Sequence, residues 1–241
     1  MEIKEIDIEG LTTLSVIEKA DKFNGWMYHT IAPFCKGRIL EIGSGIGNIS
    51  QFFVANNQEI VLSDLRDNYI EILEKKFPSS EVLKIDLVHP EFDTVYNDYL
   101  GTFDSVFALN VVEHIKDDVQ AVANCKKLLT KNGNLIILVP AFQALYNNFD
   151  IELEHFRRYT AKTLKPLFLK NDLKILKTFS FNFIGIFGWY FSGNILKKKT
   201  IPEGQMGLFN RLVPLFKLAD ILTLKKIGLS VICIANKEKS V

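Results

Sequence analysis

The chain alternates short apolar runs with longer segments in which apolar residues recur at helical spacing. The apolar runs predict β-strands, because four to eight residues are enough to cross a buried sheet. These strands are expected at residues 37–42, 59–63, 82–86, 104–109 and 134–139. The amphipathic segments predict helices at residues 47–56, 67–77, 117–130 and 160–171. Strands that alternate with helices indicate an α/β fold, in which a parallel sheet carries helices on both faces.

The two ends of the chain depart from this alternation. Residues 12–34 predict a helical lead-in, which Thr12 or Thr13 can cap and which ends near Pro33. Towards the other end, residues 174–183 and 230–235 predict two further strands. A long insertion, residues 184–229, separates them. No repeat or linker divides the sequence, so we expect a single domain over residues 1–241.

The most informative motif lies where the first predicted strand ends. Glu41 closes the strand, and three alternate glycines follow it, Gly43, Gly45 and Gly47. Glycine lets the backbone turn sharply and leaves room for a ligand against it. The unpaired N–H groups at the start of the next helix face the same crevice. The spacing differs from the Gly-x-Gly-x-x-Gly of dinucleotide binders, and Glu41 would repel a pyrophosphate.

A second acid, Asp64, ends the next predicted strand. It falls about 20 residues past the glycine loop, where a carboxylate can bind both hydroxyls of a ribose. Glu41, for its part, suits a ligand with a cationic amino group. An adenosine that carries a charged amino-acid tail meets both requirements, and S-adenosylmethionine is such a molecule.

With these residues the sequence resembles the class I S-adenosylmethionine-dependent methyltransferases, most clearly over residues 37–140. The resemblance implies a Rossmann-like seven-stranded sheet, mostly parallel, with an antiparallel C-terminal hairpin. It also implies that the insertion at 184–229 is a C-terminal cap over the substrate pocket. The expected cofactor-binding residues are Tyr28, Glu41, Gly43, Ser44, Gly45, Gly47, Asp64, Leu65, Asp86, Leu87 and Asn110. For Asp86 a simple turn cap is the alternative interpretation.

Two segments after the later strands carry the candidate catalytic residues. Glu113 and His114 follow the fourth strand and resemble a Glu-His pair of the family, in which the histidine lies near the sulfonium or orients the loop. Residues 154–160 resemble a His-x-Arg-Arg-Tyr segment of one branch of bacterial small-molecule methyltransferases. Glu154 stands where that branch usually has a glycine. On this resemblance His155 is a candidate general base, and His114 and Tyr159 are further catalytic candidates.

The residues beside His155 allow two interpretations. Arg157 or Arg158 can bind an anionic group of the substrate. Alternatively, both arginines pair with surface acids, Tyr159 packs in the interior and Thr160 caps the next helix. The sequence leaves both open. Aromatic residues that would complete the substrate pocket are Tyr146, Trp189 and Tyr190.

The insertion is rich in aromatic residues and in lysine. It contains seven Lys and Arg residues against two acids. Apolar rings beside lysines are typical of a lid over an apolar substrate or of a contact with a membrane surface. They also occur in an ordinary cap with a solvated basic edge. We do not expect membrane binding, because the cations are scattered between apolar segments.

Composition narrows the class of function further. The 241-residue chain has a formal net charge of +1, so it has no strong field for nucleic acid. No Cys/His cluster has zinc-ligand spacing, and no metal is expected. Residues 1–5 are charged and lack the apolar core of a signal peptide. Polar residues interrupt the apolar stretch 179–196, so a spanning helix is not expected. We expect a cytoplasmic protein and leave its oligomeric state open.

The sequence therefore predicts transfer of a methyl group from S-adenosylmethionine to a hydroxyl, carboxyl or amine of a small or lipid-like molecule. Two alternatives belong to other classes. A nicotinamide-dependent oxidoreductase is disfavoured by Glu41 and by the glycine spacing. A non-enzymatic module that binds S-adenosylmethionine, or a partner through its aromatic cap, stays open.

Overall fold

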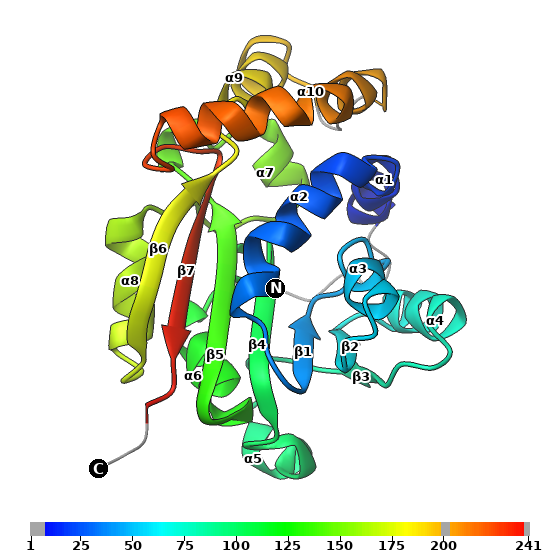
Figure 1. The fold of residues 1–241 in the computed structure, drawn as a ribbon, viewed down its shortest axis with the longest axis vertical. Coiled ribbons are helices and arrows are strands. Elements are labelled where there is room, and N and C mark those ends of the chain that lie inside the picture. Colours follow the sequence, from blue (N-terminus) through cyan, green and yellow to red (C-terminus); the bar gives the residue numbers. More distant parts are fainter. Residues whose placement is uncertain (1–7, 199–202, 239–241) are drawn as a thin grey trace.

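A seven-stranded sheet forms the centre of the protein in the computed structural model, which describes residues 8–198 and 203–238 (Figure 1). Its strands are β1 (Ile39–Ile42), β2 (Ile60–Asp64), β3 (Val82–Lys84), β4 (Phe103–Leu109), β5 (Leu129–Pro140), β6 (Lys174–Phe181) and β7 (Ser230–Asn236). Their order across the sheet is β3-β2-β1-β4-β5-β7-β6. The first five run parallel, and β7 is antiparallel to both β5 and β6. The predicted mixed sheet with its antiparallel C-terminal hairpin is confirmed.

Helices follow most of the strands, as the sequence pattern predicts. They are α1 (Ile8–Glu18), α2 (Asp21–Ile31), α3 (Ser50–Ala55), α4 (Asp67–Lys76), α5 (Phe92–Val95), α6 (Asp118–Leu128), α7 (Asn148–Glu152), α8 (Ala161–Leu169), α9 (Gly185–Tyr190) and α10 (Glu203–Leu222). The side chain of Thr160 accepts a hydrogen bond from the backbone of Thr163, which confirms it as the cap of α8. The sequence analysis missed α5 and α7, because helices this short show no apolar periodicity.

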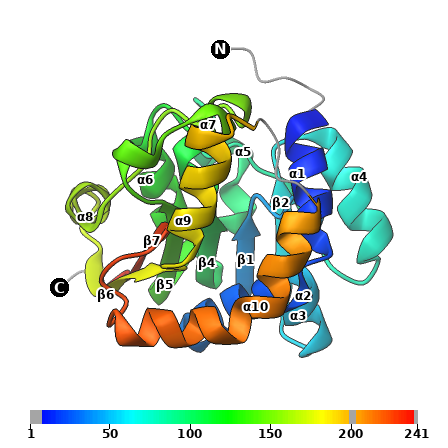
Figure 2. The same cartoon turned by 90° about the horizontal axis from the view of Figure 1, so that it is seen from above.

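Both faces of the sheet are buried, and β5 shows why its sequence is apolar throughout. Leu135, Ile137 and Val139 pack into one hydrophobic layer, which also includes residues of α5, α6 and α8. Ile136 and Leu138 pack into the other layer, with residues of α2, α3 and α4 (Figure 2). Successive side chains of a strand point to opposite faces, so a strand covered on both sides needs apolar residues at every position.

The lead-in differs from the prediction of one helix over residues 12–34. It forms two helices, α1 and α2, and the chain leaves the helical conformation at Ala20 between them. The break lets the two helices bury different faces. Val16 of α1 packs with Met206 of α10, whereas Trp26 of α2 packs into the core beside the sheet. Pro33 lies in a short 3-10 turn after α2, where the prediction placed the end of the lead-in.

The insertion between β6 and β7 forms α9, a π-helical turn (Phe191–Ile195) and α10. These helices lie beyond the ends of the strands, at the top of Figure 1. Polar contacts fix α10 near its middle and close to its C-terminal end. Asn210 accepts a hydrogen bond from the backbone of Phe23 at 3.0 Å. The carboxylate of Asp220 accepts hydrogen bonds from the backbone N–H groups of Asn182 and Phe183, at 2.9 and 2.7 Å.

Some predictions concern residues that the structure does not describe. Residues 1–5 and Lys199 lie outside the described ranges. Among the helices within those ranges, none is long and apolar enough to cross a membrane.

Asp220 is the buried acid that ties the end of α10 to the segment after β6. We expect Asp220→Ala to lower the free energy of unfolding by about 2–4 kcal/mol, because two buried N–H groups lose their acceptor. Urea denaturation measures this change. Asp93→Ala is the matched control: Asp93 pairs with Lys127 at the surface, and its loss should change stability by less than about 1 kcal/mol. Equal effects of the two substitutions would contradict the anchoring role.

Candidate functional site

The glycine loop after β1 is closely packed against its neighbours. Gly43 has a φ of +69°. A Cβ atom there would lie 2.4 Å from Cγ2 of Val111, in the segment after β4. The backbone N–H of Ser44 donates to the carbonyl of Ser63 in β2 at 2.8 Å. Any residue larger than glycine at position 43 would therefore push the loop away from the strand ends.

Glu41 lies buried at the end of β1. Its Oε2 accepts a hydrogen bond from the hydroxyl of Ser50, the first residue of α3. Burial raises the pKa of this carboxyl to about 7, although hydrogen bonds from Ser50 and Ser44 oppose the shift. Glu41 therefore links the strand end to the start of the helix and gains or loses a proton near neutral pH.

Asp64 joins the end of β2 to the same loop. Its Oδ2 accepts from the N–H of Gly45 at 3.0 Å, and its Oδ1 accepts from the N–H groups of Leu65 at 2.8 Å and Arg66 at 3.2 Å. Burial raises the pKa of Asp64, and these backbone donors oppose the rise. A carboxylate has about four acceptor positions. The three backbone donors occupy three of these positions and leave one acceptor position for a ligand hydroxyl.

The residues predicted to contact the adenine and methionine parts of the cofactor differ in their surroundings. Oδ1 of Asp86 accepts from the N–H of Val88 at 2.9 Å, so Asp86 does close the turn that the alternative interpretation describes. Leu87 is buried in the core. Asn110 is exposed directly after β4 and has a φ of +55°. Asn110 thus stands at the same edge of the sheet as the glycine loop.

Tyr28 does not lie at this edge. Its hydroxyl donates to Gln58 at 3.0 Å, and its ring packs against Phe52 and Phe53. Gln58 precedes β2, whereas ligands of parallel sheets bind beyond the carboxyl ends of the strands. The cofactor role expected for Tyr28 stays a prediction, and its contacts place the tyrosine beside Gln58, Phe52 and Phe53.

A second polar centre forms around Asp150, in the segment that follows β5. Oδ1 of Asp150 lies 2.8 Å from Nδ1 of His155 and accepts from Nε of Arg158 at 2.8 Å. Oδ2 accepts from the backbone N–H of Asn147 at 3.0 Å. All three side chains, Asp150, His155 and Arg158, are buried. The carboxylate fixes the imidazole through Nδ1 and leaves Nε2 as its reactive nitrogen.

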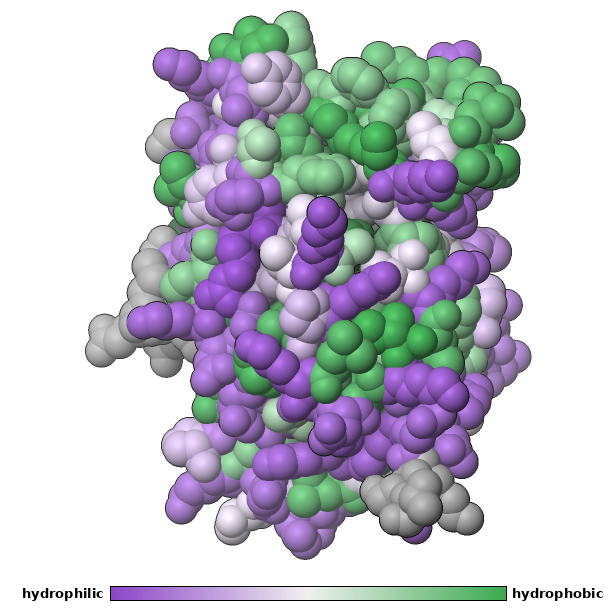
Figure 3. Space-filling model, turned by 90° about the vertical axis from the view of Figure 1, so that its left-hand side faces the viewer, coloured by the Kyte–Doolittle hydropathy of each residue, from purple (hydrophilic) through white to green (hydrophobic). Residues whose placement is uncertain are grey.

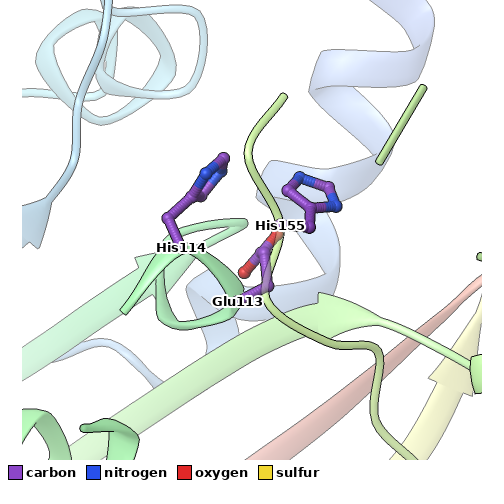
Figure 4. Close-up of side chains that lie close together, drawn as sticks. All are labelled: Glu113, His114 and His155. Carbon is purple, nitrogen blue, oxygen red and sulfur yellow. The ribbon is translucent and has the colours of Figure 1, made fainter. Parts of the chain in front are cut away.

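Glu113 and His114 lie close to His155, in a 3-10 turn after β4 (Figure 4). The centroids of the two imidazole rings are 4.6 Å apart. Glu113 is fully buried, and neither of its carboxyl oxygens has a hydrogen-bond partner. Burial raises the pKa of Glu113 to about 8. The His-containing segments after β4 and β5 thus meet at one place.

The two arginines of the His-x-Arg-Arg-Tyr segment have separate roles. Arg157 forms an ion pair with Asp118 at 2.6 Å, and the hydroxyl of Tyr159 donates to the same carboxylate at 2.8 Å. The buried Arg158 also donates to the carbonyl of Ala141 at 3.1 Å. These contacts match the alternative in which the arginines pair with acids and Tyr159 packs, and the substrate and catalytic roles of the three residues stay predictions. The structure uses all three to hold the loop.

The aromatic residues predicted to line the substrate pocket also differ in their contacts. The Tyr146 hydroxyl donates to the carbonyl of His155 at 2.7 Å, which supports the loop. Trp189 donates to the carbonyl of Leu145 at 3.1 Å, and its ring lies under the guanidinium of Arg158, 4.6 Å away. The cap therefore rests on the segment that carries His155. Tyr190 remains exposed.

Asp150 is the residue of this polar centre that the sequence analysis missed. Its signal is the spacing of Asn147 and Asp150, which form a reciprocal capping box at the start of α7. From the sequence alone, an acid at the third position of a helix is interpreted as part of the helix cap. Its contacts with His155 and Arg158 depend on the way the next loop folds back.

Comparison with known proteins adds independent findings. A family described as a methyltransferase domain matches residues 40–135. A Mycobacterium tuberculosis protein named "Probable S-adenosylmethionine-dependent methyltransferase" is 24% identical over 137 residues, which are 54% of this chain and 48% of that protein. A ubiquinone biosynthesis O-methyltransferase of Aromatoleum aromaticum is 26% identical over 113 residues, 46% of this chain and 45% of that protein. Over residues 40–135 the chain is thus similar to a methyltransferase domain, and over about half of its length to these two curated methyltransferases. It spans about half the length of these curated relatives.

Solved structures agree on the fold of the methyltransferase domain. A S-adenosylmethionine-dependent methyltransferase from Archaeoglobus fulgidus has a TM-score of 0.59 at 19% identity, and the match covers 89% of this chain and 94% of that one. Phosphoethanolamine N-methyltransferase 2 of Haemonchus contortus, solved with S-adenosyl-L-methionine, has a TM-score of 0.60 at 14% identity, over 90% of this chain and 52% of that one. At these identities the likeness shows the fold.

S-adenosylmethionine is the cofactor that the name of the Mycobacterium tuberculosis relative gives. The residues at the edge of the sheet fit it in two respects. Asp64 has an acceptor position left for a ribose hydroxyl, and the loop at Gly43 brings backbone close without a side chain. Glu41 would offset the cationic amino group, at the start of the loop.

The raised pKa of Glu41 predicts a pH dependence of stability. The pKa is 4.5 in an ordinary carboxyl and about 7 in the folded protein. Between these values the unfolded chain releases the proton first, so stability falls as pH rises from about 4.5 to 7 and then levels off. The loss that Glu41 contributes is about 3 kcal/mol.

Urea denaturation at pH 5 and pH 8 of the wild type and Glu41→Gln measures this difference. The glutamine variant should lose that part of the pH dependence. Glu71→Gln, at an exposed position, should keep it. A pH dependence identical in wild type and Glu41→Gln would show that Glu41 titrates normally.

Proposed function

We propose that this chain transfers a methyl group from S-adenosylmethionine to an oxygen or nitrogen of a small, apolar or lipid-like molecule, with a hydroxyl as the favoured acceptor. The observation that carries the proposal is the joint placement of two centres. The glycine loop with Asp64 lies at the carboxyl end of β1 and β2. The segments with His114 and His155 follow β4 and β5 in the same parallel set.

The chemistry at the second centre follows from the Asp150–His155 pair. S-adenosylmethionine supplies an activated methyl group when bound, so the protein has to position the acceptor and take its proton. Asp150 fixes His155 through Nδ1 at 2.8 Å and favours the tautomer whose Nε2 accepts a proton. A neutral hydroxyl needs such a base. Buried Arg158 offsets the negative charge of Asp150.

The nature of the acceptor rests on the cap. Of the large hydrophobic side chains that are exposed, many belong to α9, α10 and their flanking turns. A hollow of about 280 Å³ lies between α1 and α10, lined by Val16, Lys19, Gly204, Met206 and Gly207. An apolar or lipid-like molecule gains from contact with such a surface, whereas a strongly polar one does not.

Turnover of methyl-labelled S-adenosylmethionine tests the function. The full chain is incubated with the labelled cofactor and with aqueous metabolites, a lipid extract or protein from cells. We expect label in the lipid extract. Label in none of the fractions, together with tight binding of NAD and no binding of S-adenosylmethionine by calorimetry, would refute the methyltransferase proposal.

The role of His155 is tested by its removal. We expect His155→Ala to lower turnover by roughly 10²–10⁴, with the affinity for S-adenosylmethionine little changed, because the base acts on the acceptor. Calorimetry measures the affinity separately. His89→Ala, which changes a histidine outside this centre, should leave both quantities unchanged. Normal turnover in a folded His155→Ala variant would remove His155 from the mechanism.

A further inference from the structure

Glu113, His114 and His155 bring three metal-ligating groups together from two segments of the chain. One ligand atom from each side chain lies within 4.8 Å of those of the other two. Figure 4 shows the carboxyl between the two imidazole rings. Ligands of a zinc-type ion lie about 2.0–2.2 Å from it. For all three atoms to lie at that distance from one ion, the ring of the exposed His114 would turn toward the other two side chains.

Glu113 is the member of this cluster that demands a partner. Its side chain is 0% exposed, and both carboxyl oxygens lack a hydrogen bond. An unpaired buried carboxylate is strongly destabilising, so it must be neutralised by a proton or by a cation. The buried cation nearby, Arg158, already donates to Asp150 and to the carbonyl of Ala141. A metal ion is therefore a candidate for the neutralising cation.

His155 is held in the manner of a metal ligand. Nδ1 of His155 is fixed by Asp150 at 2.8 Å, and the backbone of Leu153 lies close enough to the His114 ring to raise its pKa, against the larger effect of burial. A histidine that binds a metal usually donates its other ring N–H to a carboxylate or a backbone carbonyl, which sets its tautomer and orientation. His155 has such a partner in Asp150 and keeps Nε2 for an ion.

We propose that Glu113, His114 and His155 bind a divalent transition-metal ion such as Zn²⁺. Two imidazoles and one carboxylate favour this class over Mg²⁺ or Ca²⁺, which prefer oxygen ligands. Three protein ligands leave a position open, as in catalytic sites. The proposal that an ion binds here depends only on the cluster. A role for the ion in catalysis, in which it binds the acceptor oxygen and eases loss of the proton, rests on the proposed function. With the ion bound, His155 is a ligand and the ion replaces it as the agent of deprotonation.

Titration with Co²⁺ tests the site, because bound Co²⁺ absorbs visible light. The full chain, without an affinity tag and freed of metal by a chelator, should bind one Co²⁺ and show new absorption bands. We expect Glu113→Gln and His155→Gln to weaken binding by more than about 100-fold. Asp150→Asn, which changes an outer partner, should weaken it by about 10–100-fold. His89→Gln is the matched control and should bind as the wild type does.

The outcomes separate this proposal from the proposed function. A folded wild type that binds no Co²⁺ overturns the metal site, even if it methylates its acceptor, and leaves His155 as the base. Equal Co²⁺ binding in wild type, Glu113→Gln and His155→Gln also overturns it. A protein that binds Co²⁺ through these residues but transfers no methyl group keeps the metal site and removes the proposed function. Circular dichroism confirms that each variant is folded.

The outer surface of the cap carries a second, independent inference. α10 buries Met206, Val213 and Asp220, which recur every seven residues on its inner side. Its outward stripe is also apolar. Exposed fractions there are 60% for Leu208, 62% for Leu215, 53% for Leu218 and 74% for Leu222. A helix on the surface of a water-soluble protein normally presents polar residues on that side.

The rest of the cap continues this surface. Phe187 and Tyr190 of α9, and Phe191 and Ile195 of the π-helical turn, are exposed as well. Figure 3 shows hydrophobic surface gathered at the end of the molecule where α9 and α10 lie. A contiguous exposed apolar patch of this kind marks an interaction site.

Charge indicates the partner. Exposed Arg211 and Lys217 lie along α10, and exposed Lys226 follows it. The insertion as a whole carries seven cations and two acids, and the described acid, Asp220, is buried. We infer that the cap binds the surface of an anionic lipid membrane, with apolar side chains in the interface and cations at the headgroups. This inference departs from the expectation of no membrane binding, which rested on cations scattered between apolar segments, because α10 presents an exposed apolar stripe.

Sedimentation with vesicles tests this surface. Vesicles of phosphatidylcholine with about one third phosphatidylglycerol should bind the protein, and pure phosphatidylcholine should bind it less. We expect Leu215→Gln with Leu218→Gln to weaken partitioning at least tenfold. Arg211→Gln with Lys217→Gln should weaken it by about 25-fold on the anionic vesicles, at about 1 kcal/mol for each cation. Leu169→Gln, an exposed leucine of α8, is the control.

A wild type that stays in solution with anionic vesicles would overturn the membrane inference. So would binding that is unchanged in the leucine variant. Light scattering that shows a dimer disrupted by Leu215→Gln with Leu218→Gln, with no binding to vesicles, would assign the patch to a second copy of the chain instead.

Discussion

The parallel pairing of β1, β2, β4 and β5 is the constraint on which the rest of the structure depends. Parallel strands end at one edge, so every segment that leaves their carboxyl ends meets there. The glycine loop, Asp64, the turn with Glu113 and the segment with His155 come from four different crossings of the chain. Their proximity is a consequence of strand direction, and it holds only while the register of the sheet holds.

Buried acids give this edge its chemistry. Glu41, Asp64, Glu113 and Asp150 are all buried, and they belong to β1, the end of β2, the 3-10 turn after β4 and α7. Taking a carboxylate out of water is costly unless hydrogen bonds or opposite charges replace the lost hydration. Asp64 and Asp150 have such partners in backbone N–H groups, His155 and Arg158. Glu113 has none among the described residues, which sets it apart as a group that a ligand would complete.

The cap and the loop that carries His155 are held together by hydrogen bonds and ring contacts. Trp189 of α9 donates to the backbone of Leu145 and lies under Arg158, which holds Asp150. Asn147 donates to Asn194 in the π-helical turn at 2.9 Å. A force on the outer surface of the cap therefore reaches the residues that orient His155 through three or four contacts. This coupling gives a physical route by which binding of a lipid surface can affect the acceptor side of the site.

The sequence by itself determined the strands, their alternation with helices and the glycine loop, because these depend on local periodicity and on the backbone freedom of glycine. It also placed Thr160 as a cap, which is a contact over three residues. The ends of elements shifted by a few residues, and the lead-in divided at Ala20, since packing of each half against a different partner decides where a helix breaks.

Only the tertiary structure decided which of the candidate residues lie together. Tyr28 and His155 look equally functional in the sequence, yet Tyr28 packs at the far end of β2 while His155 meets Asp150. Arg157 and Arg158 are neighbours in the chain but point to Asp118 and Asp150, which are 32 residues apart. Ion pairs and buried hydrogen bonds join residues distant in sequence. The packing of the whole sheet decides which residues become partners, and no local sequence pattern predicts these pairs.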